Sequence, residues 1–227
     1  SAIEFALAPK AVKAFLGFAA LMNGRLFKGN MHFQALGTSF RIWSDGIVSP
    51  LFEELDSTCK LIAKEYDDVD GRRELLNDPE FIQQFRDDWH HGRGENDLAS
   101  IKARLGMPDV VVPRDFGIMT FDGAPITEWD GETFQQVYNR LEAYQRGQAD
   151  QARSDAERDA FDKFPRPIRD DADFMLHMMR EYDKGFRYWV DVANVGNKAT
   201  LDLLLHKHTL PGFNDSGAHI TNMAFFD

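Results

Sequence analysis

Near the end of the chain, a carboxylate and an imidazole stand close enough in sequence to serve one catalytic site. They belong to the run Asp215-Ser216-Gly217-Ala218-His219, which follows a short apolar segment. A carboxylate directly after a strand lies at the carboxyl end of a parallel sheet or barrel, where α/β folds hold their reacting groups. Asp215 fits the role of general base or metal ligand, and His219 that of an orienting or polarising group. The same residues are ordinary turn formers, so the pattern also fits a purely structural turn.

Three other histidines lie near predicted elements of the same α/β region. His32 lies in the apolar run 31–36, a predicted buried strand, and is either a hydrogen-bonded core residue or faces the same mouth as Asp215. His206 and His208 follow a predicted short helix, where a positive charge interacts favourably with the helix dipole. Capping of that helix is therefore the expected role of both.

The remaining histidines are expected to be solvated. His90 and His91 are adjacent at a polar helix end, and neighbouring residues on a helix point about 100° apart, so they are poorly placed to chelate one ion. His177 falls outside the methionine stripe of the predicted helix 171–184. That stripe is expected to fill a hydrophobic core rather than to line a ligand groove.

The elements that must position these side chains follow an α/β order at both ends of the chain. The first predicted helix, 3–22, has Phe15, Phe18 and Met22 on its expected core-facing stripe. Polar helices are expected between 50 and 106, a strand pair at 110–112 and 117–121, and helices at 132–146 and 171–184. At the end, strands 186–192 and 210–213 flank the helix 198–206, and this order predicts a parallel pair with a right-handed crossover.

The composition narrows the range of partners. The chain has 37 acidic and 26 basic side chains, and its net charge of −11 repels a phosphate backbone and an anionic lipid surface alike. The single cysteine, Cys59, cannot form an internal disulfide or a thiolate cluster for zinc. The longest apolar run, 14–22, is about half of the roughly 20 residues of a membrane helix, and residues 1–30 lack the features of an export signal. We therefore expect a cytoplasmic protein that binds neither nucleic acid nor a membrane.

Three runs near the end of the chain, 186–194, 198–208 and 210–220, carry a resemblance to a known family. They resemble the last barrel strands of the N-acyl-D-amino-acid deacylase (D-aminoacylase-like) family of the amidohydrolase superfamily, which has a Gly-Leu-Ser-Asp-x-Gly-Ala-His run at this point. Earlier, 31–37 resembles the preceding barrel strand, and the stretch from 50 to 80 is similar to the helical region that follows it. Asn214 stands where the family more usually has Ser.

The resemblance implies an α/β fold that is part of a TIM barrel, consisting of the last βα units and a mainly helical insertion. It assigns a barrel helix and strand to residues 1–49, the insertion to 50–185, and the final barrel strands with the Asp-x-Gly-x-His motif to 186–227. Two βα units cannot close an eight-stranded barrel. The remaining part of the barrel is therefore an expected partner, in the same or another polypeptide.

The activity that the resemblance implies is metal-dependent hydrolysis of linear amide bonds, as in an N-acyl-amino-acid deacylase. Asp215 matches the catalytic aspartate of the family, which is the general base and in some members a metal contact. His219 matches the histidine beside it, and His32 and Thr38 fall where some members bind substrate. The implied cofactor is zinc, and most of its ligands are expected outside this chain. The implied substrate is a small N-acyl amino acid or a related amide.

Two other functions remain open from the sequence. The chain could be a non-catalytic helical interaction domain or subunit, which would account for the long polar helices and the charge of −11. An oligomer is also a possible assembly. An N-terminal nucleophile would use Ser1 with its own amino group as base, although a helix rather than a strand is predicted to follow it.

Overall fold

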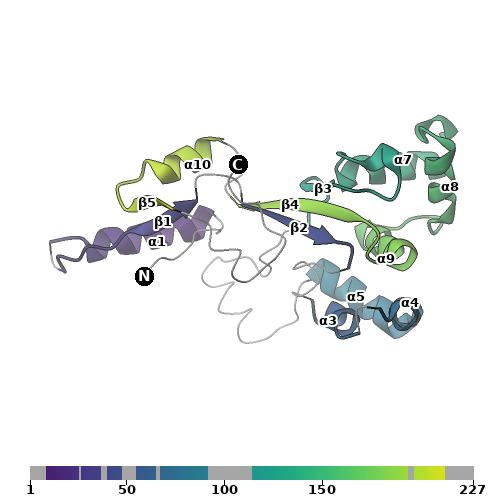
Figure 1. Cartoon of the computed structure of the whole chain (residues 1–227), viewed down its shortest axis with the longest axis horizontal. Helices are drawn as coiled ribbons and strands as arrows, with labels where there is room; N and C mark the ends of the chain where they lie inside the picture. The colour runs from purple at the N-terminus through teal and green to yellow at the C-terminus, as the bar shows by residue number, and fades with distance from the viewer. Residues whose placement is uncertain are drawn as a thin grey trace. The chain divides into compact units, whose positions relative to one another are not determined.

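The computed structural model describes residues 9–25, 27–36, 40–47, 55–64, 67–91, 114–193 and 197–212, which form helices and short strands (Figure 1). The chain divides into two compact units. Unit 1 consists of Ser1–Ile42, Asn96–Asp109 and Asp191–Asp227, and unit 2 of Trp43–Glu95 and Val110–Val190. Among the residues that are described, no helix is long and apolar enough to cross a membrane.

Unit 1 is an α/β unit in which a segment from early in the chain pairs with one from late in the chain. Its elements are α1 (Pro9–Met22), β1 (Phe33–Leu36), α10 (Asn197–Leu204) and β5 (Thr209–Gly212). The strands β1 and β5 are parallel, with Phe33 opposite Thr209, and α10 packs against both. A helix that covers two parallel strands is the arrangement that α/β folds use to bury a sheet face.

The pairing of the last strand differs from the sequence prediction. We predicted that 186–192 and 210–213 form a parallel pair, and this is wrong, because β5 pairs with β1 while β4 (Arg187–Ala193) belongs to a separate sheet. The three elements themselves are confirmed as β4, α10 and β5. Secondary structure follows from local patterns, whereas the choice of partner strand depends on residues far away in the sequence.

The small core of unit 1 forms where α1 meets β1. Ala19 and Phe33 are buried there, with Phe15, Leu16 and Met31 packed around them. The rings of Phe15 and Phe33 meet edge to face at 5.9 Å. The predicted stripe is therefore wrong at Phe18, which is 48% exposed, because a residue one position before Ala19 points about 100° away from it.

Unit 2 contains most of the helices, the strand β3, and residues 43–45 of β2 and 187–190 of β4, which form a three-stranded sheet with the order β2-β4-β3. The strand β3 is antiparallel to β4, with Thr120 opposite Trp189. The predicted helices 132–146 and 171–184 are confirmed as α7 and α9, whereas 98–105 and 110–112 lie outside the described residues. The remaining bounds are β2 (Phe40–Asp45), α3 (Asp56–Ile62), α4 (Val69–Asn77), α5 (Pro79–His91), β3 (Met119–Phe121), the 3₁₀ turns η1 (Thr127–Trp129) and η2 (Ala149–Gln151), α7 (Phe134–Gln145), α8 (Asp155–Lys163) and α9 (Asp171–Tyr182).

Aromatic rings dominate the core of unit 2. The ring of Phe116 meets those of Trp89, Phe134 and Phe174 edge to face, at centroid distances of 5.3 to 6.3 Å. The methionine stripe of α9 is fully buried, which confirms that it fills the core; its members are Met175, Met178 and Met179. Edge-to-face pairs add to the free energy of burial and fix how the helices α5, α7 and α9 pack.

Gly46 ends β2 in a conformation that only glycine accommodates here, with φ of +57°. A Cβ at this position would lie 2.1 Å from the carbonyl oxygen of Asp183, so Gly46→Ala is expected to destabilise unit 2 by more than about 1 kcal/mol. Gly131 is the matched control, because its φ is also positive, at +78°, but a Cβ there would meet no atom within 4 Å. Urea unfolding of both variants measures the difference, and equal losses would show that the contact with Asp183 carries no cost.

Candidate functional site

Of the residues assigned to the site from sequence, His32 is the one that the structure describes. Asp215, His219 and Thr38 lie outside the described residues, so their assignments as general base, metal contact and substrate contacts stay predictions. The described strand that leads to Asp215 is β5, which ends at Gly212. The geometry of β5 and its neighbour β1 therefore defines where the carboxyl edge of this sheet begins.

His32 lies at the amino edge of that sheet. It directly precedes β1, is half-buried, and its ring centroid is 6.2 Å from that of His208, which directly precedes β5. Because β1 and β5 are parallel and in register, both histidines stand at the edge opposite to the one where the strands end. The carboxyl edge lies about 13 Å further along these four-residue strands. The substrate role of His32 stays a prediction. In that role, His32 would contact the substrate from the amino edge of the sheet.

His208 is held by Asn23 in a defined tautomer. The side-chain amide of Asn23 accepts from the Met31 backbone N–H and donates to the Met31 carbonyl oxygen, which fixes its orientation. Its Nδ2 lies 3.1 Å from Nδ1 of His208, so Nδ1 accepts and Nε2 carries the proton of the neutral ring. The side chain is 8% exposed. This burial, followed by the charges of Lys207, His206 and His32, lowers the pKa of His208.

His208 does not have the expected role of an exposed helix cap, because its ring is buried and hydrogen-bonded to Asn23. His206 accepts at Nδ1 from the backbone N–H of His208, and their ring centroids are 5.6 Å apart. A protonated Nε2 on His208 leaves that ring without a free lone pair for a metal ion. Within the described part of unit 1, no three histidine, cysteine or carboxylate groups come together as metal ligands. These histidines therefore do not by themselves fit a zinc centre.

A set of metal-ligand side chains does occur in unit 2, where the end of α5 meets the start of α9. His90, Asp170 and Asp171 each offer a ligand atom, and these atoms lie within 4.8 Å of one another. His90 Nε2 is 3.3 Å from Oδ2 of Asp170. The sequence predicted only that His90 is solvated and did not predict its contact with Asp170. The two residues are 80 positions apart, and no local pattern connects them.

The carboxylates beside His90 belong to an ion-pair network. Arg86 on α5 donates to both carboxylate oxygens of Asp170 and, at 2.5 Å, to Asp173, which Arg169 also binds. Burial acts to raise the pKa of Asp170, but the hydrogen bonds from Arg86 and from the backbone N–H of Asp173 outweigh it, and the pKa lies below its usual value. Asp170 thus stays ionised and also caps α9 by accepting from the Asp173 backbone N–H.

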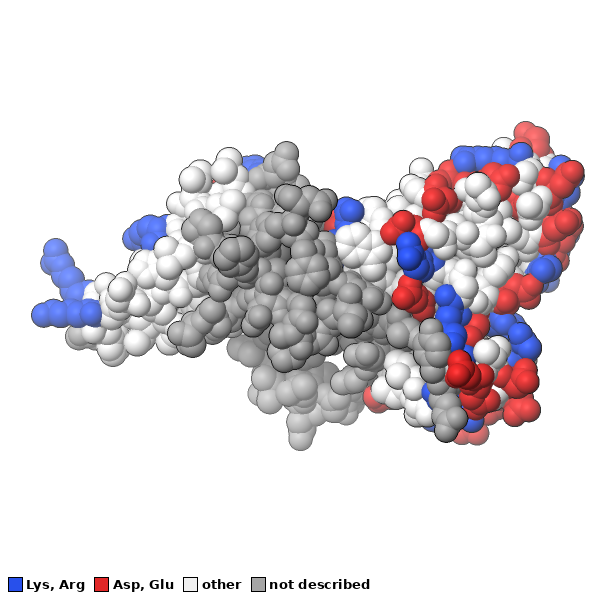
Figure 2. Space-filling model, viewed as in Figure 1, with Lys and Arg blue, Asp and Glu red and all other residues white. Residues whose placement is uncertain are grey.

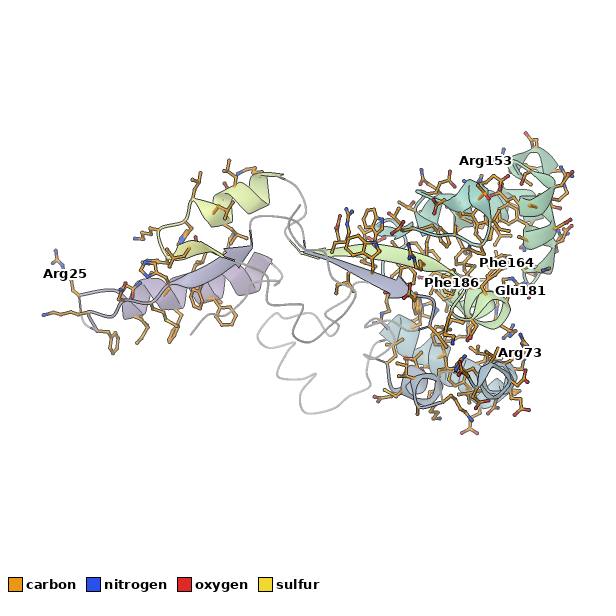
Figure 3. The ribbon with its side chains drawn as sticks, viewed as in Figure 1. Arg25, Arg73, Arg153, Phe164, Glu181 and Phe186 are labelled. Atoms are coloured by element: carbon orange, nitrogen blue, oxygen red, sulfur yellow. The ribbon has the colours of Figure 1, made fainter. Side chains whose placement is uncertain are left out.

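His177 is buried in unit 2, which corrects the prediction that it is solvated. Its side chain is 5% exposed and its ring lies 3.8 Å from that of Phe164, centroid to centroid. Figure 3 labels Phe164 and also Glu181, which is a residue of α9 itself. Burial lowers the pKa of His177 to about 4. Glu181 acts against this shift to a smaller extent, whereas the charges of Arg180 and Lys163 add to it. The helical stripe misled the prediction because α9 is buried on more than one face.

The depressed pKa of His177 predicts a loss of stability in acid. Between the unfolded pKa of about 6.5 and the folded pKa of about 4, the unfolded chain binds a proton that the folded chain does not. The stabilisation is complete above that window and falls by on the order of 2–3 kcal/mol as the pH drops through it. Urea unfolding at pH 4.5 and 7.5 should show a smaller pH effect in His177→Leu than in wild type. The same effect in both proteins would contradict this assignment.

Comparisons with protein-family models, with curated proteins and with solved structures found no match to this chain.

Proposed function

We propose that this chain belongs to a metal-dependent hydrolase of linear amide bonds, similar to the N-acyl-amino-acid deacylases, with Asp215 as its general base. The observation that carries the proposal is the parallel, in-register pair of β1 and β5, covered by α10. This pair brings two segments 176 residues apart into adjacent strands of one sheet, with unit 2 inserted between them in sequence. The order helix, strand, insertion, helix, strand is the one expected for neighbouring units of an α/β barrel.

The surface of unit 1 supports the idea that further βα units complete the fold. Within the described residues, β1 and β5 pair only with each other, so each has an open edge. Large apolar side chains are exposed on the same unit: Phe18, Leu21, Phe27, Leu201, Leu205 and Leu210. On the face that Figure 2 shows, the described part of unit 1 is mostly white, with uncharged side chains, whereas acidic and basic side chains are dense on unit 2. Open strand edges and apolar helix faces are what adjoining barrel units would cover.

In this proposal, Asp215 takes the proton of the attacking water and delivers it to the leaving amine. His219 orients the substrate in this proposal. Zinc is the metal that the family resemblance implies, and the described histidines of unit 1 do not form its site. Its ligands would come mostly from outside these residues, so no step is assigned to it. The proposed substrate is a small N-acyl amino acid or a related amide.

A non-catalytic interaction subunit is the second candidate. The charged surface of unit 2 favours it, because such a surface can bind a partner protein without any catalytic group (Figure 2). In that case, unit 1 would still need a partner for its apolar face, but Asp215 would have no chemical role.

An amide-hydrolysis assay distinguishes the two candidates. The full-length gene product, purified with Zn²⁺ present, is incubated with N-acetyl derivatives of L- and D-amino acids, and release of the free amine is measured. We expect hydrolysis of at least one class of substrate and its loss after chelation of the metal. Absence of hydrolysis in a folded, zinc-loaded protein would favour the interaction subunit.

A further inference from the structure

We propose that unit 2 holds a divalent transition-metal ion between α5 and α9, bound by His90, Asp170 and Asp171. The site uses residues of unit 2 alone, and the inference does not depend on the proposed hydrolase activity. It rests on ligand geometry, on two anchored helix ends and on the local charge.

The ligand atoms come from two different helix ends. His90 lies at the end of α5, while Asp170 and Asp171 form the N-cap and first residue of α9. With all three ligand atoms within 4.8 Å of one another, small side-chain rotations bring them to the distances of about 2.0–2.2 Å that a bound Zn²⁺ requires. His90 is 37% exposed, and an ion can therefore reach the site from solvent.

Both helix ends are fixed by packing before any ion binds. Trp89, the neighbour of His90, is buried and stacks on Phe85 at a centroid distance of 5.5 Å. On the other side, Ala172 is fully buried and Asp170 caps its helix. The helices α5 and α9 pack directly against each other. Ligands held on packed helices lose little conformational entropy when they bind a metal.

The local charge favours a cation. Arg86 and Arg169 offset the charges of Asp170 and Asp173. Among the described residues, Asp171 has no ion pair, and its Oδ1 accepts only from the Ala172 backbone N–H at 3.0 Å. Three carboxylates against two guanidinium groups leave one net negative charge among these five side chains. Arg86 would remain hydrogen-bonded to Asp170, as carboxylate ligands in metal sites commonly are.

The donor set identifies the class of metal. One imidazole nitrogen with two carboxylate oxygens suits Zn²⁺, Co²⁺ or Ni²⁺, whereas Ca²⁺ and Mg²⁺ prefer oxygen ligands alone. Three protein ligands leave at least one position for water. Because it joins α5 to α9, the ion would tie together two helices of unit 2 and stabilise their packing.

Metal titration tests the site. The full chain, freed of metal, is titrated with Zn²⁺ by calorimetry and with Co²⁺ by visible absorption, and Mg²⁺ serves as the comparison ion. We expect one Zn²⁺ per chain at this site, little response to Mg²⁺, and a rise in Tm of roughly 5–10 °C at a hundredfold excess of Zn²⁺ over Kd. Absence of Zn²⁺ binding would overturn the proposal.

Variants locate the ion. His90→Ala and Asp171→Asn each remove one ligand and are expected to weaken Zn²⁺ binding at least ~10-fold, with loss of the Co²⁺ absorption band. His91→Ala is the matched control, because it removes the histidine that is adjacent in sequence, and it should bind as wild type does. Unchanged binding in both ligand variants, or equal weakening in His91→Ala, would place the ion elsewhere and contradict the site.

Discussion

Glu157→Ala is expected to destabilise unit 2 by about 3–5 kcal/mol, the cost of breaking a buried ion pair from one side. Glu157 on α8 is fully buried, and three groups donate to its carboxylate. Oε1 accepts from Trp129 Nε1 at 2.9 Å and from Arg140 Nη2 at 2.8 Å, while Oε2 accepts from the Arg153 backbone N–H at 2.7 Å. Removal of the side chain leaves Trp129 Nε1 and the Arg153 backbone N–H facing an empty space, and it leaves Arg140 with Glu132 as its remaining carboxylate partner.

The charge balance explains why removal of the Glu157 carboxylate is expected to lower the free energy of unfolding more than removal of a surface carboxylate. Arg140 is nearly buried, and it pairs with Glu157 and, at 2.6 Å, with Glu132. Arg153, labelled in Figure 3, also reaches Glu132. Burial acts to lower the pKa of Arg140, but its two carboxylate partners outweigh it and the pKa is raised. Two guanidiniums and two carboxylates are thus balanced, and without Glu157 a net positive charge would remain in a largely buried network.

Urea unfolding followed by tryptophan fluorescence measures the effect. Glu157→Gln keeps the size and one acceptor oxygen, so its expected loss is smaller, at about 1–3 kcal/mol. Arg158→Ala is the control on the same helix, because its pair with Asp155 is exposed and such changes stay within about 0.5 kcal/mol. If Glu157→Ala were no less stable than Arg158→Ala, the network would be shown to contribute nothing.

The helices could be predicted from the sequence because their signals are local. The spacing of apolar residues over 132–146 and 171–184 identified α7 and α9, and Thr133 with Gln136 forms the capping box that begins α7. Periodicity also predicted that the methionines of α9 are buried. It failed for His177 because α9 is covered on several sides, and a stripe identifies only one of them.

The strand partners and the paired charges could not be predicted in the same way. Nothing near Thr209 in the sequence indicates that Phe33 lies opposite it, and the prediction chose the nearer strand, 186–192, instead. His90 and Asp170 likewise meet through the packing of α5 on α9, which depends on the whole aromatic core of unit 2. Motifs indicate which side chains can do chemistry, but packing determines which of them meet.

Asp215→Asn is expected to lower kcat/KM for amide hydrolysis by ~10²–10⁴-fold, the usual contribution of a general base. The amide keeps the shape of the side chain but cannot accept a proton from water. Asp202→Asn is the matched control, because Asp202 lies on α10 in the same unit, is exposed, and pairs only with Lys198 among the described residues. That variant should retain wild-type activity.

The most direct test of the proposed function is therefore kcat/KM of the full-length protein with its best N-acyl-amino-acid substrate, measured from pH 5 to 9 for wild type, Asp215→Asn and Asp202→Asn. We predict that the decline of activity towards acid, which reports protonation of the base, is present in wild type and in Asp202→Asn and disappears with the activity in Asp215→Asn. Wild-type kcat/KM and an unchanged pH profile in Asp215→Asn would contradict the assignment of Asp215 as the base.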